Sequence, residues 1–308
     1  MSVVVVQLYF LVLGALFVVL ERGCRIRAAT LTFAVILQGF AIVCLALFPS
    51  IPSVRLAYLL ALLGPVAFFP FTFPLRDFAV DGAGVCRRIF FRSIYAVLLL
   101  LGNPMIAGLS RSVSALALFT VLCQTLLLHN EAFFWRKIEA LLGAQLALLV
   151  GFFAAFPGIP FFIIPGVLYL ILTAFFLQAL VPVRMTSTIY DLRGSCGKNG
   201  SRSFCIAAVL LASVFSPTLV LVLSLFPALA LLGFRTLPLI LTATAMVQLT
   251  AVLRTIALLF SAPPAVVPGN FEENRQKNFP QFLSMVGVLV LLAIFLATAI
   301  RGPFRILR

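Results

Sequence analysis

Long apolar runs, separated by short polar stretches, follow one another along almost the whole chain. As a helix, a run of about 20 apolar residues crosses the hydrocarbon core of a bilayer. Inside hydrocarbon the backbone must bond to itself, which favours helices. The runs are continuous and lack the apolar–polar alternation of membrane barrel strands. The pattern therefore predicts an all-α protein: a polytopic integral membrane helical bundle.

The order of the runs predicts about ten transmembrane helices. The expected spans are 3–20, 28–48, 56–74, 91–110, 112–128, 138–156, 160–183, 204–226, 237–260 and 281–300. The stretch 204–260 admits two long helices, three short ones or a re-entrant segment, so about nine to eleven crossings are compatible with the pattern. The polar loop 184–203 divides a seven-helix block (1–183) from a three-helix block with a short basic tail (204–308).

Charged residues lie in the connections between runs. Only 10% of the residues are charged, against 63% hydrophobic, and the net charge is +14. Most arginines and lysines fall in every second loop, which by the positive-inside rule predicts an outside N-terminus and a cytoplasmic basic face, in the inner membrane of a bacterium. Anionic lipid head groups are the expected partners of this face. No separate basic domain is present, which excludes nucleic-acid binding.

All acidic side chains fall at or beyond the ends of the runs, and this predicts an interior without an intramembrane carboxylate relay. The eight are Glu21, Asp77, Asp81, Glu131, Glu139, Asp191, Glu272 and Glu273. A single histidine and six cysteines without metal-ligand spacing argue against haem, zinc and other metal sites. We expect no cofactor and no catalytic motif of the common hydrolase or nucleotide-binding kinds.

Uncharged polar residues inside the runs form the first candidate site. Thr244, Gln248 and Thr255 are spaced to lie on one stripe of the span 237–260, with Arg254 beside them, and Asn103 precedes a proline in another span. These residues are candidates for lining a neutral, hydrogen-bonding pathway for a polar or anionic solute. The alternative is that the glutamine and threonines only join helices, and that Arg254 extends to the membrane surface.

The second candidate site lies in the loop after the third span. Asp77 and Asp81 are four residues apart, with Arg87 and Arg88 close by. Such a group suits a Mg²⁺-bound diphosphate at the head-group level, although no second acidic cluster completes it. The alternative is a solvated loop whose acids balance neighbouring arginines.

The segment HNEAFFWRKIE contains the only tryptophan, Trp135, followed by Arg136 and Lys137. Tryptophan beside basic residues is typical of an anchor at the membrane–water interface. We therefore interpret Trp135 as an interfacial anchor.

Together these patterns favour a transport protein over an enzyme: a solute permease, or the membrane subunit of a larger transporter with other membrane or ATPase subunits as partners. Two alternatives remain. One is a membrane enzyme that processes a lipid or diphosphate with Asp77 and Asp81. The other is a seven-helix sensor or scaffold.

Overall fold

The described part of the chain is entirely helical. The computed structural model describes residues 3–22, 59, 61–66, 68, 81–102, 110–155, 163–181, 188–193, 200–215 and 236–261. Its elements are α1 (Val3–Arg22), the 3-10 turn η2 (Gly64–Val66), α4 (Gly82–Gly102), α6 (Ser110–Asn130), α7 (Phe134–Ala155), α8 (Ile163–Leu180), the 3-10 turn η5 (Ile189–Leu192), α10 (Gly200–Val214) and α13 (Thr236–Phe260).

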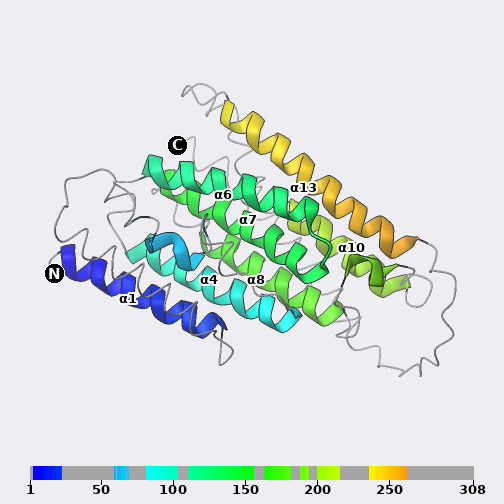
Figure 1. Ribbon diagram of the computed structural model, residues 1–308, viewed down its shortest axis with the longest axis horizontal. Coiled ribbons are helices and arrows are strands. Elements are labelled where there is room, and N and C mark those ends of the chain that lie inside the picture. The colour runs from blue at the N-terminus through cyan, green and yellow to red at the C-terminus, as the bar shows by residue number, and fades with distance from the viewer. Residues whose placement is uncertain are drawn as a thin grey trace.

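Helix α7 forms the core of the bundle. It contacts α4, α6, α8 and α10, while α1 packs on α4 at one edge and α13 packs on α6 and α10 at the other (Figure 1). Within the span Phe134–Ala154 of α7, 89% is buried inside the protein, against 39% for the span of α6 and 33% for that of α13. Helix α7 is thus shielded from lipid by its neighbours, whereas α6 and α13 expose broad apolar faces.

Four of the described helices are long and apolar enough to cross a membrane. They are Ser112–Asn130, Phe134–Ala154, Ile163–Leu180 and Leu239–Phe260, and they fall where the spans 112–128, 138–156, 160–183 and 237–260 were expected. An integral membrane protein is confirmed. The expected spans 28–48 and 281–300 lie outside the described residues, as does most of 56–74. The count of about ten, the three-part division and the outside N-terminus stay predictions.

Helix α4 begins earlier than the span 91–110 suggested. The backbone N–H of Gly84 donates to Oδ1 of Asp81 at 2.9 Å, which caps the first turn and satisfies a donor that no helical carbonyl reaches. The helix therefore includes Arg87 and Arg88, which the sequence pattern placed in the preceding loop. At its other end α4 is described as far as Gly102.

The hairpin of α6 and α7 is packed backbone to backbone. Ser114 Oγ donates to the carbonyl of Gly151 at 3.1 Å. A Cβ added at Gly151 would lie 2.5 Å from the Cβ of Ala117. Because no real side chain tolerates that distance, glycine is needed at position 151 for the two helices to approach so closely.

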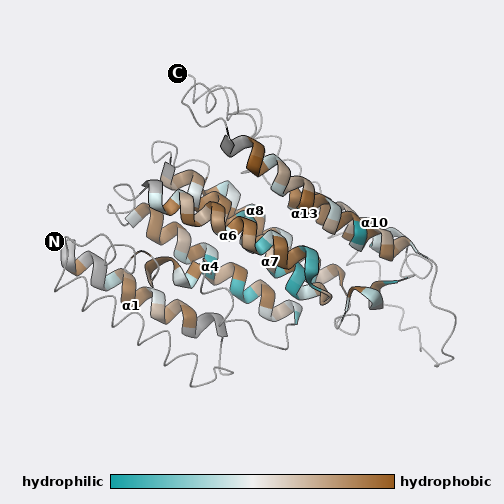
Figure 2. Cartoon of the chain, turned by 45° about the horizontal axis from the view of Figure 1, so that its top comes forward, coloured by the Kyte–Doolittle hydropathy of each residue, from teal (hydrophilic) through white to brown (hydrophobic). Residues whose placement is uncertain are grey.

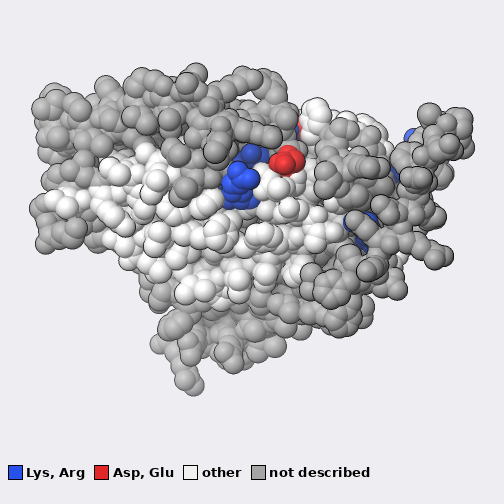
Figure 3. All heavy atoms as spheres, turned by 90° about the horizontal axis from the view of Figure 1, so that it is seen from below, with Lys and Arg blue, Asp and Glu red and all other residues white. Residues whose placement is uncertain are grey.

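The charged side chains that the structure describes lie towards one end of the bundle, which we call the basic end. Here α4, α7 and α10 begin and α6, α8 and α13 end, as cross-links such as Ile189 N to Ala132 O at 2.8 Å show. The helices are mostly apolar, with strongly hydrophilic residues gathered where α6 and α7 meet (Figure 2). On the face in Figure 3, basic and acidic side chains lie side by side near the middle of the view, and further basic side chains lie towards one side of it. The described charged side chains are Asp81, Arg87, Arg88, Arg92, Glu131, Arg136, Lys137, Glu139, Arg193, Arg202 and Arg254.

Candidate functional site

Three buried, uncharged side chains join α6, α7 and α13 in the interior. We call Thr125, Gln145 and Gln248 the amide seam. Gln248 Nε2 donates to Thr125 Oγ1 at 2.8 Å, and Gln145 Nε2 donates to Gln248 Oε1 at 3.1 Å and to the carbonyl of Val214 in α10 at 3.4 Å. The seam therefore links four helices through side chains that carry no charge.

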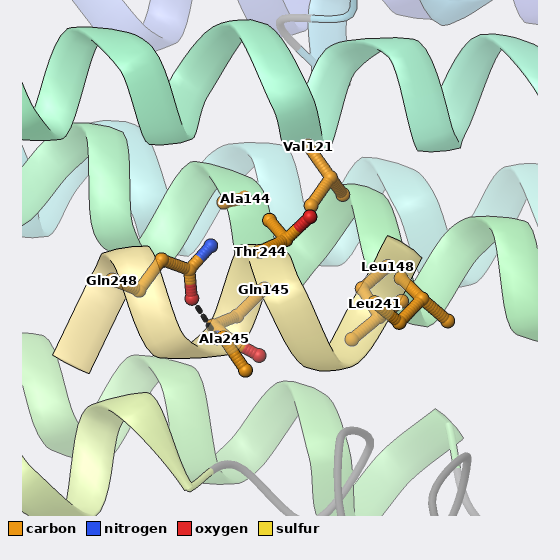
Figure 4. Close-up of a pocket in the computed structure, with 8 residues that line it drawn as sticks. All are labelled: Val121, Ala144, Gln145, Leu148, Leu241, Thr244, Ala245 and Gln248. Carbon is orange, nitrogen blue, oxygen red and sulfur yellow. Dashed lines mark hydrogen bonds between the residues drawn. The ribbon is translucent and has the colours of Figure 1, made fainter. Parts of the chain in front are cut away.

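A small cavity adjoins the seam between α6, α7 and α13 (Figure 4). The cavity has a volume of about 10 Å³. This volume is at the lower limit for holding a single water molecule. The lining combines the two glutamines with Val121, Ala144, Leu148, Leu241, Thr244 and Ala245. In this conformation the cavity excludes any larger solute.

The structure brings together part of the pathway expected from the sequence. Thr244, Gln248 and Thr255 are all buried on one face of α13, and the first two line the cavity. The hydroxyl of Thr244 bonds to the carbonyl of Ile240 at 2.7 Å, and that of Thr255 to Ala251 at 3.0 Å. Both threonine hydroxyls therefore bond within α13 itself. Of the three side chains, Gln248 is the one whose described hydrogen bonds reach other helices.

The other two pathway candidates are not at the seam. Arg254 is exposed and faces away from the buried stripe of α13, and Asn103 lies outside the described residues. Gln145 and Thr125, by contrast, were not singled out as a site. The signal for Gln145 was a glutamine inside an apolar run, but its pairing with Gln248 spans 103 residues of sequence and has no local signature.

A second polar cluster, between α4 and α7, contains a carboxylate. Arg88 Nε and Nη2 lie 2.9 and 3.0 Å from Oε1 and Oε2 of Glu139, and Arg92 Nη1 lies 3.0 Å from Oε1. The side chains are 7%, 6% and 17% exposed for Arg88, Arg92 and Glu139. The two arginines, four residues apart, share one face of α4, and both pair with the same carboxylate.

The structure describes three of the four residues proposed for a phosphate site, and all three lie at the start of α4. Asp81 is exposed and caps α4, and Arg87 is exposed on the same helix. Arg88 pairs with Glu139 through Nε and Nη2. Its Nη1 lies beside Asp81, since an added Cβ at Gly84 would be 3.7 Å from Arg88 Nη1 and 2.6 Å from Asp81 Oδ1. Asp77 lies outside the described residues.

The interpretation of Trp135 as an exposed interfacial anchor is wrong. Its side chain is 1% exposed, and the ring packs against Gly82 at the start of α4, where a Cβ would lie 2.5 Å from Cζ2. The absence of a side chain at Gly82 creates the space that the indole fills. Trp135 Nε1 is buried and has no hydrogen-bond partner among the described residues. The tryptophan is thus part of the α4–α7 core.

The helices, their hydropathy and the uncharged seam define an integral membrane helical bundle. No protein-family model matches the sequence, and no curated protein matches it either. Among solved structures, the fold is similar to that of a chain of respiratory complex I from Thermus thermophilus with bound aureothin. The TM-score is 0.64 at 17% identity, over 87% of this chain and 66% of that one. This chain therefore spans just under two thirds of the length of that neighbour, and the likeness concerns the fold alone.

Proposed function

We propose that this protein is a membrane subunit of a larger transport complex, and that the amide seam forms part of its route for a small polar solute. The observation that carries the proposal is the bond between Gln145 and Gln248 beside the cavity. An interhelical amide pair in an apolar interior offers both donors and acceptors to a passing solute. The likeness in fold to a chain of a respiratory complex supports the subunit part of the proposal.

Helix α13 is the element that can open the route. It is the least buried of the four candidate spans, and it is tied to α6 and α7 through Gln248. Elements with few buried contacts are the ones that move at low cost. Separating Gln145 from Gln248 enlarges the cavity between the three helices and leaves both amides free to bond a solute.

The route does not depend on a titrating carboxylate. Glu139, a partly buried acid, is held by both Arg88 and Arg92, so its charge is balanced in place. Around the seam itself the lining residues are uncharged. This arrangement suits a hydrogen-bonding solute better than an ion, since an ion without a countercharge is costly to bury.

Cysteine accessibility along α13 tests the proposal. In a variant without native cysteines, Thr244→Cys and Gln248→Cys are reacted with a membrane-impermeant thiol reagent in sealed liposomes. Met246→Cys is the matched control, because its side chain is 58% exposed on the outer side of the same helix and so faces lipid. We expect Thr244→Cys and Gln248→Cys to react several times faster than Met246→Cys.

Equal, slow labelling at all three positions would show that the seam stays dry, and the transport proposal would then be abandoned. A second arm measures the oligomeric state of the native protein in mild detergent. A complex larger than the monomer supports the subunit assignment, and a monomer that retains all transport activity contradicts it.

A further inference from the structure

The face of α7 that lines the cavity continues towards the basic end, and Lys137 lies on it. The cavity-lining residues of α7 include Ala144 and Leu148. Lys137 precedes them by seven and eleven residues, intervals that return to nearly the same side of an α-helix. Because α7 begins at the basic end, Lys137 lies between the cavity and that end, about 10 Å from Ala144 along the helix axis.

Helix α13 continues in the same direction from the other side of the cavity. Thr255 follows Gln248 by seven residues, and both side chains are buried. On α7, buried Leu141 lies one turn after Lys137 and one turn before Gln145. A solute that leaves the amide seam towards the basic end therefore passes one apolar level and then reaches the levels of Lys137 and Thr255.

Lys137 is a buried cation whose charge is not cancelled by a direct ion pair. The residue is 3% exposed, and its ammonium group forms no ion pair with any residue that the structure describes. Arg88 and Arg92 differ in this respect, because both pair with Glu139. Glu139, two residues after Lys137, lies on the opposite side of α7.

Two other charged residues contribute to the electrostatic potential at Lys137. Arg254 of α13 and Glu131 at the α6–α7 turn both interact with it electrostatically. The three residues together carry an excess of one positive charge. Arg254 is exposed and Glu131 is partly exposed, so water screens their charges, whereas the charge of Lys137 lies among apolar side chains and acts more strongly on its surroundings. The potential on this face of α7 is therefore positive.

We propose that Lys137 is the selectivity residue of the route: its ammonium group rejects cations at the basic end and admits solutes that are uncharged or carry a negative group. The inference rests on the proposed function, since it names the class of solute that the amide seam conducts. Fixed charges and electrostatic barriers discriminate between solutes in other membrane pathways. The seam itself does not discriminate by sign, because its amides offer both donors and acceptors.

The test compares thiol reagents of similar size and different charge. Thr244→Cys is the reporter, because Thr244 lines the cavity and its hydroxyl bonds within its own helix. The full chain, without native cysteines, is placed in sealed vesicles with the basic end outward. It is reacted with sulfonatoethyl, trimethylammonioethyl and methyl methanethiosulfonate, which are negative, positive and uncharged.

Each rate is expressed relative to that of the same reagent with a free thiol in water. On this scale we expect the negative reagent to react at least about tenfold faster than the positive one, which is the lower end of the concentrating effect of a charged cleft. Lys137→Met removes the charge at similar length and is expected to reduce this preference severalfold. Lys137→Arg retains the charge and is expected to retain the preference.

Arg136→Gln is the matched control at the neighbouring position. The guanidinium of Arg136 lies over the ring of Phe133, 4.9 Å from its centroid, and the residue is partly exposed. Because solvent and salt screen such a charge, its removal is expected to change the preference by less than about twofold. The uncharged reagent is the internal control, and its rate is expected to be the same in all variants.

Three results would overturn the inference. A preference for the negative reagent that survives Lys137→Met would show that another group selects by charge. An equal loss of preference in Arg136→Gln would assign the selectivity to the basic end as a whole. Faster labelling by the uncharged reagent in Lys137→Met would show that the lysine seals the helices instead of selecting by charge.

The same experiment separates the inference from the proposed function. If Thr244→Cys reacts with none of the three reagents, the cavity is closed to solutes, and the route and its selectivity are both refuted. If all three reagents react without preference for either sign, the route stands and the role of Lys137 is refuted. Reaction with the expected preference, lost in Lys137→Met, supports both.

Discussion

Glu139 illustrates how single residues determine the interior of this bundle. Its carboxylate accepts a hydrogen bond from Arg88 Nη2 at 3.0 Å and forms ion pairs with Arg88 and Arg92 at 2.9 and 3.0 Å between α4 and α7. Both arginines are nearly inaccessible, so each depends on Glu139 for part of its countercharge. Removal of the acid therefore takes from both arginines the carboxylate that they share, and breaking a buried ion pair from one side costs more than loss of the pair as a whole.

We expect Glu139→Ala to destabilise the protein by about 3–5 kcal/mol, the usual cost of breaking a buried ion pair from one side. The measurement is helical circular dichroism during unfolding in mixed detergent micelles. Glu131→Gln is the matched control, since Glu131 lies at the α6–α7 turn and is only partly buried, and it is expected to change stability by less than about 1 kcal/mol. A similar loss from both variants would contradict the special role of Glu139.

At the scale of elements, the closest contact is that between α6 and α7. Glycine is normally unfavourable within a helix, and its replacement by alanine gains about 1 kcal/mol where space allows. At Gly151 there is no space, because Ala117 occupies the position of the new methyl group. At Gly143 on the same helix the nearest atom to an added Cβ is Gln124 Nε2 at 3.5 Å, an ordinary contact.

We therefore expect substitution by alanine to change the stability of the protein in opposite directions at the two glycines of α7. Gly151→Ala is expected to destabilise the bundle by about 1–3 kcal/mol through overpacking, whereas Gly143→Ala is expected to be neutral or stabilising. Thermal unfolding in detergent, followed by the fluorescence of Trp135, compares them directly. If Gly151→Ala were as stable as the natural protein, the close approach of α6 and α7 would be refuted.

The positions of helices can be predicted from the sequence where a helix coincides with a long apolar run. The expected spans at 112–128, 138–156, 160–183 and 237–260 match described helices to within a few residues, because apolar length alone defines them. The start of α4 was missed for a physical reason. Its arginines resemble loop residues, yet Glu139, 51 positions away from Arg88, removes the cost of burying them.

The candidate site, too, can be predicted from the sequence only in part. The buried face with Thr244, Gln248 and Thr255 follows from helical spacing within one segment, and the structure places all three there. The partners of Gln248 do not follow from spacing, since Thr125 and Gln145 come from other helices. Likewise, Trp135 was misplaced because its basic neighbours suggest an interface, whereas the space left by Gly82 belongs to a distant helix.

At the scale of the whole molecule, the segregation of charge to one end makes orientation testable. The positive-inside rule predicts that the basic end faces the cytoplasm. In a background without native cysteines, Tyr190→Cys in η5 at the basic end and Ile164→Cys at the start of α8 at the other end are both exposed positions, at 54% and 62%. We expect an impermeant thiol reagent to label Tyr190→Cys only in inside-out vesicles and Ile164→Cys only in right-side-out vesicles. The reverse labelling would invert the assigned topology.

The enclosed position of α7 has a consequence for how the protein is made. Residues of α7 leave the ribosome before most of their hydrogen-bond partners. Val214 and Gln248, which bond to Gln145, lie 69 and 103 residues downstream of it. Of the described neighbours of α7, α4 and α6 are already present to receive it. Nascent α7 must therefore enter the bilayer in a hairpin with α6, with its amide unsatisfied in lipid or sheltered by an insertion factor. The seam closes only when α13 arrives, so it is among the last native contacts to form during biosynthesis.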